Sequence, residues 1–148
     1  MQIGVDATCW HNNRGYGRHA RALLSALIAR DTGNRYTLVM DAPPDPASVP
    51  PGARVQQLRA GTPAALAASA DGHRSPVHLL AMSRALSGGS WDLVLFPSVY
   101  SYVPVLTRAR KLVIIHDVIA ETYPELTVPN PTARLFWKAK VALGRMQA

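Results

Sequence analysis

The sequence reads IGVDA at residues 3–7, the polar loop TCWHNNR at 8–14, the segment YGRHARALLSALIAR at 16–30 and YTLVM at 36–40. The first and last of these runs are short and apolar, as in buried strands. The segment between them repeats its apolar residues at three- and four-residue steps, which is typical of an amphipathic helix. The residues of this stripe are Ala20, Leu23, Leu24, Leu27 and Ile28. We therefore predict a strand, a long loop, a helix and a second strand.

The same alternation continues along the rest of the chain. Prolines crowd residues 43–51, which predicts a surface loop. Further strands are expected at residues 54–58, 92–96 and 112–115. Further helices are expected between Pro63 and Leu86, with a break around Asp71-Gly72-His73 and an end at Gly88-Gly89, and from Pro131 onward, with Asn130 as the N-cap. Short apolar strands that alternate with helices predict an α/β protein with a Rossmann-like, doubly wound parallel sheet.

Length and composition restrict the class of protein. The chain has 148 residues, of which 48% are hydrophobic and 17% charged, so it fits one folded domain and is too apolar for a disordered segment. Its most apolar window, residues 93–106, is interrupted by Pro97 and Pro104, so we expect no membrane-spanning helix. The single Cys9 excludes an internal disulfide, and residues 1–6 lack the pattern of a secretion signal. We expect a cytoplasmic protein.

The charge balance predicts an anionic partner. Sixteen Lys and Arg residues stand against nine Asp and Glu, a formal net charge of +7. These basic residues are spread along the chain in ones and twos without a groove-reading motif, so nucleic acid is not the expected partner. The anionic partners that remain as candidates are a phosphate group and an anionic membrane surface.

The last helix carries part of this charge. It contains Arg134, Lys138, Lys140 and Arg145 without any acidic residue, alongside Phe136 and Trp137. This composition suits peripheral contact with the inner membrane surface. The alternative is that its apolar positions pack on the sheet while the basic side chains are simply solvated. Those apolar positions are Leu135, Ala139, Ala142, Leu143 and Met146.

Polar residues follow the expected strands at the edge where ligands bind in such sheets. The residues that come after strand ends are Asp6, Asp41, Ser98, and the pair His116 and Asp117. Asp6 and Asp41 could equally accept hydrogen bonds from loop N–H groups. His116 is favoured as a functional residue because Asp117 follows it directly at a strand end that the topology aims at the ligand crevice.

The loop Gly15-Tyr16-Gly17-Arg18 lies between the first strand and its helix. Glycines there let a ligand approach the backbone, and the helix start attracts phosphate. With Ala20 the spacing also matches G-x-G-x-x-A, and Asp41 follows about 20 residues on, as in NAD-type dinucleotide-binding domains. Besides a phosphate-binding loop and a dinucleotide fingerprint, the third interpretation is that these glycines only form a tight turn before the helix. No Cys and His residues have metal-ligand spacing, so we expect no metal.

Three segments resemble the N-terminal half of glycosyltransferase family four, the retaining nucleotide-sugar transferases of the GT-B fold. The opening MQIGVDATCW with RGYGRHA at residues 14–20 looks like that family's first strand, loop and G-x-G helix start. KLVIIHDVI at 111–119 looks like its strand ending in His-Asp, and YPEL at 123–126 with RLFWK at 134–138 resembles the segment and helix that follow. The resemblance covers most of the chain.

The resemblance implies one half of a GT-B enzyme, with the Gly15–Arg18 loop facing the diphosphate of a nucleotide-sugar donor. It implies catalytic roles for His116 and Asp117, an acceptor-binding role for Asp6, Ser98 and Tyr100, and no metal or other cofactor. The acceptor would be a saccharide or a lipid-linked saccharide. The family's second domain, which grips the donor and carries a Glu-(seven residues)-Glu motif, is not found in residues 1–148. We therefore expect an acceptor-binding half that is inactive alone, with an NAD-type domain or a non-catalytic binding module as the alternatives.

Overall fold

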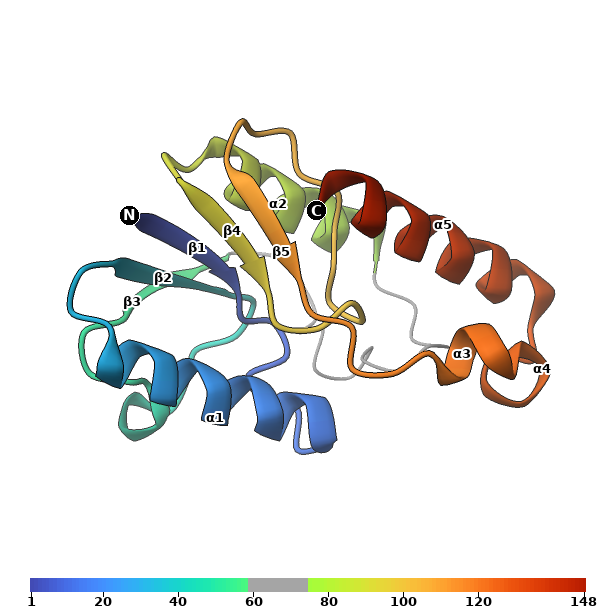
Figure 1. Cartoon of the computed structure of the whole chain (residues 1–148), viewed down its shortest axis with the longest axis horizontal. Helices are drawn as coiled ribbons and strands as arrows, with labels where there is room; N and C mark the ends of the chain where they lie inside the picture. Colours follow the sequence, from blue (N-terminus) through green and yellow to red (C-terminus); the bar gives the residue numbers. More distant parts are fainter. Residues whose placement is uncertain (59–74) are drawn as a thin grey trace.

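The computed structural model describes residues 1–58 and 75–148 (Figure 1). The strands are β1 (Gln2–Asp6), β2 (Arg35–Met40), β3 (Arg54–Gln57), β4 (Leu93–Phe96) and β5 (Arg110–Val113). The helices are α1 (Gly15–Arg30), α2 (Pro76–Gly88), α3 (Ile119–Thr122), α4 (Pro124–Thr127) and α5 (Pro131–Gln147), with a 3₁₀ turn at Pro46–Ser48. The expected helix that begins at Pro63, and the break at residues 71–73, lie outside the described residues.

The described strands form a parallel sheet of five in the order β3-β2-β1-β4-β5. This order confirms the predicted Rossmann-like α/β fold. Strand β1 lies in the centre, where Gly4 pairs with Thr37 of β2 on one side and Val94 of β4 on the other. The chain order reverses between β1 and β4, which makes the carboxyl ends of these two strands the expected ligand crevice.

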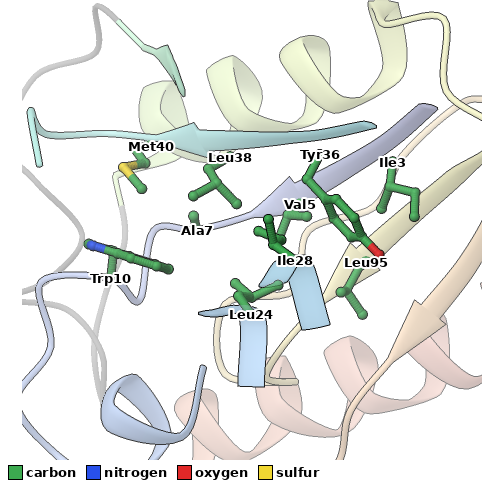
Figure 2. Close-up of a cluster of buried hydrophobic side chains, with 10 residues drawn as sticks. All are labelled: Ile3, Val5, Ala7, Trp10, Leu24, Ile28, Tyr36, Leu38, Met40 and Leu95. Carbon is green, nitrogen blue, oxygen red and sulfur yellow. The ribbon is translucent and has the colours of Figure 1, made fainter. Parts of the chain in front are cut away.

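The sheet is covered on both faces (Figure 1). Helix α1 packs on one face, where alternate residues of the central strands meet Leu24 and Ile28 (Figure 2). Helix α2 packs on the opposite face, where Met82 and Leu86 meet Phe96. Helix α5 packs beside β5, where Val113 lies against a third buried cluster that contains Trp137. The loops beyond the carboxyl ends contribute to these clusters as well, through Trp10 after β1 and Val99 after β4.

Strand β5 begins and ends two residues earlier than predicted, at Arg110–Val113 rather than 112–115. Its register is set by β4, whose last residue, Phe96, pairs with Val113 before Pro97 ends the strand. One further backbone bond, from Ile114 N–H to the Phe96 carbonyl at 2.9 Å, closes the ladder. His116 therefore lies on the loop beyond the strand and does not follow it directly.

Of the two interpretations of the last helix, α5, the one in which its predicted apolar positions pack on the sheet is wrong. The buried residues of α5 are Ala133, Trp137, Val141 and Gly144, whereas the five apolar positions that could have packed on the sheet are all exposed. The buried residues recur at four- and three-residue steps and so form a second continuous stripe, on which a Cβ atom at Gly144 would lie at an ordinary contact distance, 3.9 Å, from the Tyr102 ring. Trp137 thus belongs to the core. No helix within residues 1–58 or 75–148 is long and apolar enough to cross a membrane.

Candidate functional site

Two ring contacts join α1 to the loops beyond β4 and β5. The rings of Tyr16 and Tyr100 lie with centroids 5.4 Å apart, and those of His19 and His116 meet edge to face at 4.7 Å. Tyr16 and His19 belong to the first turns of α1, Tyr100 follows β4, and His116 follows β5. The structure therefore brings together three of the predicted segments at the carboxyl edge of the sheet. His19 was missed, because only the fold places it beside His116.

His116 is held by its Nε2 atom, which lies 2.9 Å from the Pro97 carbonyl oxygen. A carbonyl oxygen only accepts, so Nε2 carries the proton and Nδ1 of the neutral ring is left as an acceptor. The ring is half-buried, between the α1 side chain of His19 and the loop after β4. This arrangement lets Nδ1 accept a hydrogen bond from a ligand hydroxyl.

Asp117 and Ser98 hold the turns in which they lie. Asp117 is exposed, and its Oδ1 atom accepts from the Ile119 N–H at 3.0 Å, which fixes the turn into α3. Ser98 is buried, and its Oγ atom accepts from the Tyr100 N–H at 3.2 Å. Both residues thus shape the loops that present His116 and Tyr100.

Tyr100 sits on a tightly held loop. The Val99 N–H donates to the Ile114 carbonyl at 2.9 Å, and Lys140 Nζ of α5 donates to the Tyr100 carbonyl at 3.2 Å. The Trp137 ring lies 5.1 Å from the Tyr100 ring, which also contacts the Tyr16 ring at 5.4 Å. Burial, and then the nearby Asp117 and Glu121 carboxylates, raise the pKa of the Tyr100 phenol. Tyr100 therefore keeps its proton at neutral pH and can donate a hydrogen bond through its phenol, while its ring packs against Tyr16 and Trp137.

The two glycines predicted to lie in a loop before the helix belong instead to the first turn of α1, and their surroundings differ. Gly15 is exposed, and a Cβ atom there would have nothing within 4 Å. Gly17 is buried, and a Cβ atom there would lie 2.0 Å from the Asn12 carbonyl oxygen. The preceding loop is held in turn by Arg21, whose Nη1 atom donates to the carbonyls of Trp10 and Asn12. Gly17 therefore serves the packing of the first turn of α1 on the preceding loop, while Gly15 is the position open to a ligand.

The start of α1 is the one long helix start that carries no side-chain cap among the described residues. Arg14 occupies its N-cap without a side-chain hydrogen bond, whereas Ser75 caps α2 and Asn130 caps α5. The first turn of α1 also lacks an acidic residue, and Arg14 and Arg18 are exposed beside it. The absence of a side-chain cap at Arg14, the helix dipole and two guanidinium groups together favour an anion at this position.

The two aspartates after β1 and β2 are buried. Asp6 Oδ1 accepts from the Thr8 N–H at 3.0 Å and from Thr8 Oγ1 at 2.7 Å, which fixes the turn after β1. Asp6 Oδ2 has no hydrogen-bond partner among residues 1–58 and 75–148. Asp41 pairs instead with His78 Nε2 of α2 at 3.1 Å, with both side chains buried. Direct contact of Asp6 with an acceptor stays a prediction.

The fold and this edge define a Rossmann-like α/β protein whose polar side chains converge at the switch point of its sheet. In the part of the chain that the structure describes, no three His, Cys, Asp or Glu side chains gather as metal ligands would. Comparison with protein-family models, with curated proteins and with solved structures finds no match. The geometry of the site and the sequence resemblance are therefore the two indications of what this chain does.

Proposed function

We propose that this chain is the acceptor-binding half of a retaining glycosyltransferase that moves a sugar from a nucleotide-diphosphate sugar to a saccharide or lipid-linked acceptor. The observation that carries the proposal is the meeting of Tyr100 and His116 with the uncapped start of α1. A sugar-transfer site needs groups that bind and orient the acceptor hydroxyls on one side and a diphosphate site on the other. These parts lie side by side here.

Each part has a role in the proposed reaction. The Tyr100 phenol donates a hydrogen bond to the acceptor sugar, while Tyr16 and Trp137 hold its ring in place. His116 Nδ1 accepts the proton of the reacting hydroxyl and orients its oxygen. As the bond between the donor sugar and its diphosphate breaks, negative charge grows on the leaving diphosphate. The start of α1, with Arg14 and Arg18, stabilises that charge.

The proposal includes a second, donor-binding domain. An open sheet edge forms one wall of a crevice, so the reacting sugar remains accessible to water. A domain closing over the edge would exclude that water and hold the nucleotide. We expect residues 1–148 alone to consume no nucleotide sugar, and clear turnover by the isolated chain would contradict the proposed division into two halves.

Two contacts weigh against the dinucleotide alternative. In that class the second glycine lets the backbone approach a pyrophosphate, but Gly17 faces the Asn12 carbonyl. The acidic residue that should bind the ribose is Asp41, which is buried in its pair with His78. Neither residue is placed to contact a dinucleotide.

Titration of the ¹⁵N-labelled chain with inorganic pyrophosphate, UDP and NAD tests these alternatives. We expect pyrophosphate and UDP to shift the amide signals of Gly15–Arg18, and the Arg14→Ala and Arg18→Ala variants to weaken this binding. Arg30→Ala, an exposed change at the other end of α1, serves as the matched control. Tight NAD binding at the same amides would support a dinucleotide-binding domain. No response to any of the three would favour a non-catalytic module.

A further inference from the structure

Helix α5 has two apolar faces, and only one of them is covered. The outer face exposes 69% of Leu135, 69% of Phe136 and 81% of Met146. Ala139, Ala142 and Leu143 are also exposed. Residues 135, 139, 142 and 146 follow one another at four- and three-residue steps and therefore form one stripe along the helix. We call Leu135, Phe136, Ala139, Ala142, Leu143 and Met146 the outer stripe.

Basic side chains border this stripe. Arg134, Lys138 and Arg145 lie four and seven residues apart, which places them on a line parallel to the stripe at one of its borders. Lys138 and Arg145 are exposed, whereas Arg134 is half-buried and donates to the carbonyls of Val128 and Pro129. The helix contains no acidic residue that could neutralise these charges.

From this pattern we infer that α5 docks the protein on an anionic lipid surface, with the outer stripe inserted at the headgroup boundary. An apolar face flanked by Lys and Arg is the form of helix that lies in a membrane interface. Leu135, Phe136 and Met146 enter the acyl boundary, while Lys138 and Arg145 meet lipid phosphates. The charges thus select the partner and the apolar side chains provide the contact.

A second copy of this chain fits the face less well. Symmetric pairing of two α5 helices would bring Lys138 and Arg145 against a surface that carries the same cations and no carboxylates. The acidic residues nearest along the chain, Glu121 and Glu125, belong to α3 and α4, beyond the amino-terminal end of α5 (Figure 1). The charge of the face therefore favours lipid phosphate.

The inference does not depend on any enzymatic activity, because it concerns the outer side of α5. The residues that hold the Tyr100 loop, Trp137 and Lys140, lie off the outer stripe. A failure of lipid binding and a failure of the proposed function can therefore be told apart.

Co-sedimentation of the full chain with vesicles tests the inference. One set of vesicles contains phosphatidylcholine alone, and the other adds about 30% phosphatidylglycerol, to supply the negative surface potential. We expect binding only to the anionic vesicles, and weaker binding as salt is added. Lys138→Gln and Arg145→Gln should each lower the partition coefficient by about fivefold.

Variants of the outer stripe separate insertion from simple charge attraction. Leu135→Ser combined with Met146→Ser should reduce binding to anionic vesicles by about tenfold or more, since both side chains would leave the acyl boundary. Leu143 and Leu27 form a matched pair, 39% and 38% exposed, on helices that cover opposite faces of the sheet. Leu143→Ser should weaken binding, whereas Leu27→Ser should not. Equal binding to both kinds of vesicle, no binding to either, or a dimer in sedimentation that the stripe variants dissolve would overturn the inference.

Discussion

Gly17 packs directly on the backbone of Asn12, so closely that a Cβ atom would lie 2.0 Å from the Asn12 carbonyl oxygen. We expect Gly17→Ala to destabilise the protein by about 1–3 kcal/mol, because the loop must move to admit the methyl group. Gly15→Ala is the matched control, since its Cβ would enter open space. Gly15→Ala should either leave the free energy of unfolding within about 1 kcal/mol of its original value or increase it. Urea unfolding of both variants checks this, and equal effects would contradict it.

Trp137 and Phe136 are adjacent aromatic residues with opposite exposure, 6% and 69%. Trp137→Ala should lower the free energy of unfolding by about 3–5 kcal/mol, because it empties the space between α5 and Tyr100. Phe136→Ala should change it by less than about 0.5 kcal/mol. Denaturant titration measures both values. A large loss with Phe136→Ala would mean that the other face of α5 is the one that packs.

Asp31 makes stability depend on pH in the acid range. Its carboxylate accepts from Tyr36 Oη and Asn34 Nδ2, both at 2.5 Å, and these bonds lower its pKa from 3.8 to about 2. Because the pKa in the folded state is the lower one, the stabilisation is complete above pH 3.8 and is lost as pH falls toward about 2. We expect the stability advantage over Asp31→Asn to shrink across this window, as followed by melting temperature.

The same variant has a second readout in Tyr36. Burial, and then the hydrogen bond to Asp31, raise the pKa of Tyr36 to about 12. Asp31→Asn removes the negative charge beside the phenol, so this pKa should fall. Ultraviolet titration of the tyrosines measures it. An unchanged titration would show that the bond between Asp31 and Tyr36 is not made in solution.

Removal of the Nδ1 acceptor of His116 should lower kcat. In the enzyme completed by a donor-binding domain, we expect His116→Ala to reduce kcat by about 100-fold, the usual size of such contributions. The fall in stability should be about 1 kcal/mol, because one hydrogen bond is lost from a half-buried ring.

Two amide variants test which ring nitrogen of His116 matters. Gln at position 116 places its amide near Nε2 and can keep the bond to Pro97, whereas Asn places its amide oxygen near Nδ1. The proposed role predicts more activity for His116→Asn than for His116→Gln. The reverse order would make His116 a structural residue that holds Pro97.

Much of the fold could be predicted from the sequence because local patterns determine it. Short apolar strands and the three- and four-residue steps of α1 were visible in the chain, and Asn130 with Pro131 marked the start of α5. The meeting of Tyr16, Tyr100 and His116 also followed from one rule, since the carboxyl ends of parallel strands share an edge.

The remaining features depend on partners distant in sequence. Helix α5 carries two stripes that could both pack, and only the stripe of Trp137 and Val141 meets Val113 of β5 and the Tyr100 loop. Strand β5 took its register from β4 rather than from its own hydrophobicity. From the sequence, Asp41 was a candidate ligand-binding residue, but in the fold it pairs with His78 of α2. The hydrophobic periodicity of the sequence describes one helix or strand at a time, so it does not show which distant elements will pair.

The order of the sheet also determines when it can form. Strand β1 lies in the centre, yet its neighbour β4 arrives only after about ninety residues: the Gln2 N–H donates to Asp92 Oδ2 at 2.7 Å, and the Asp92 N–H donates to the Gln2 carbonyl at 2.9 Å. Pairing β1 with β2 closes a much shorter segment of chain. During synthesis, therefore, the first strand, helix and second strand can associate early, while one edge of β1 waits for its partner. Closing so long a segment makes slow folding the natural expectation for this domain.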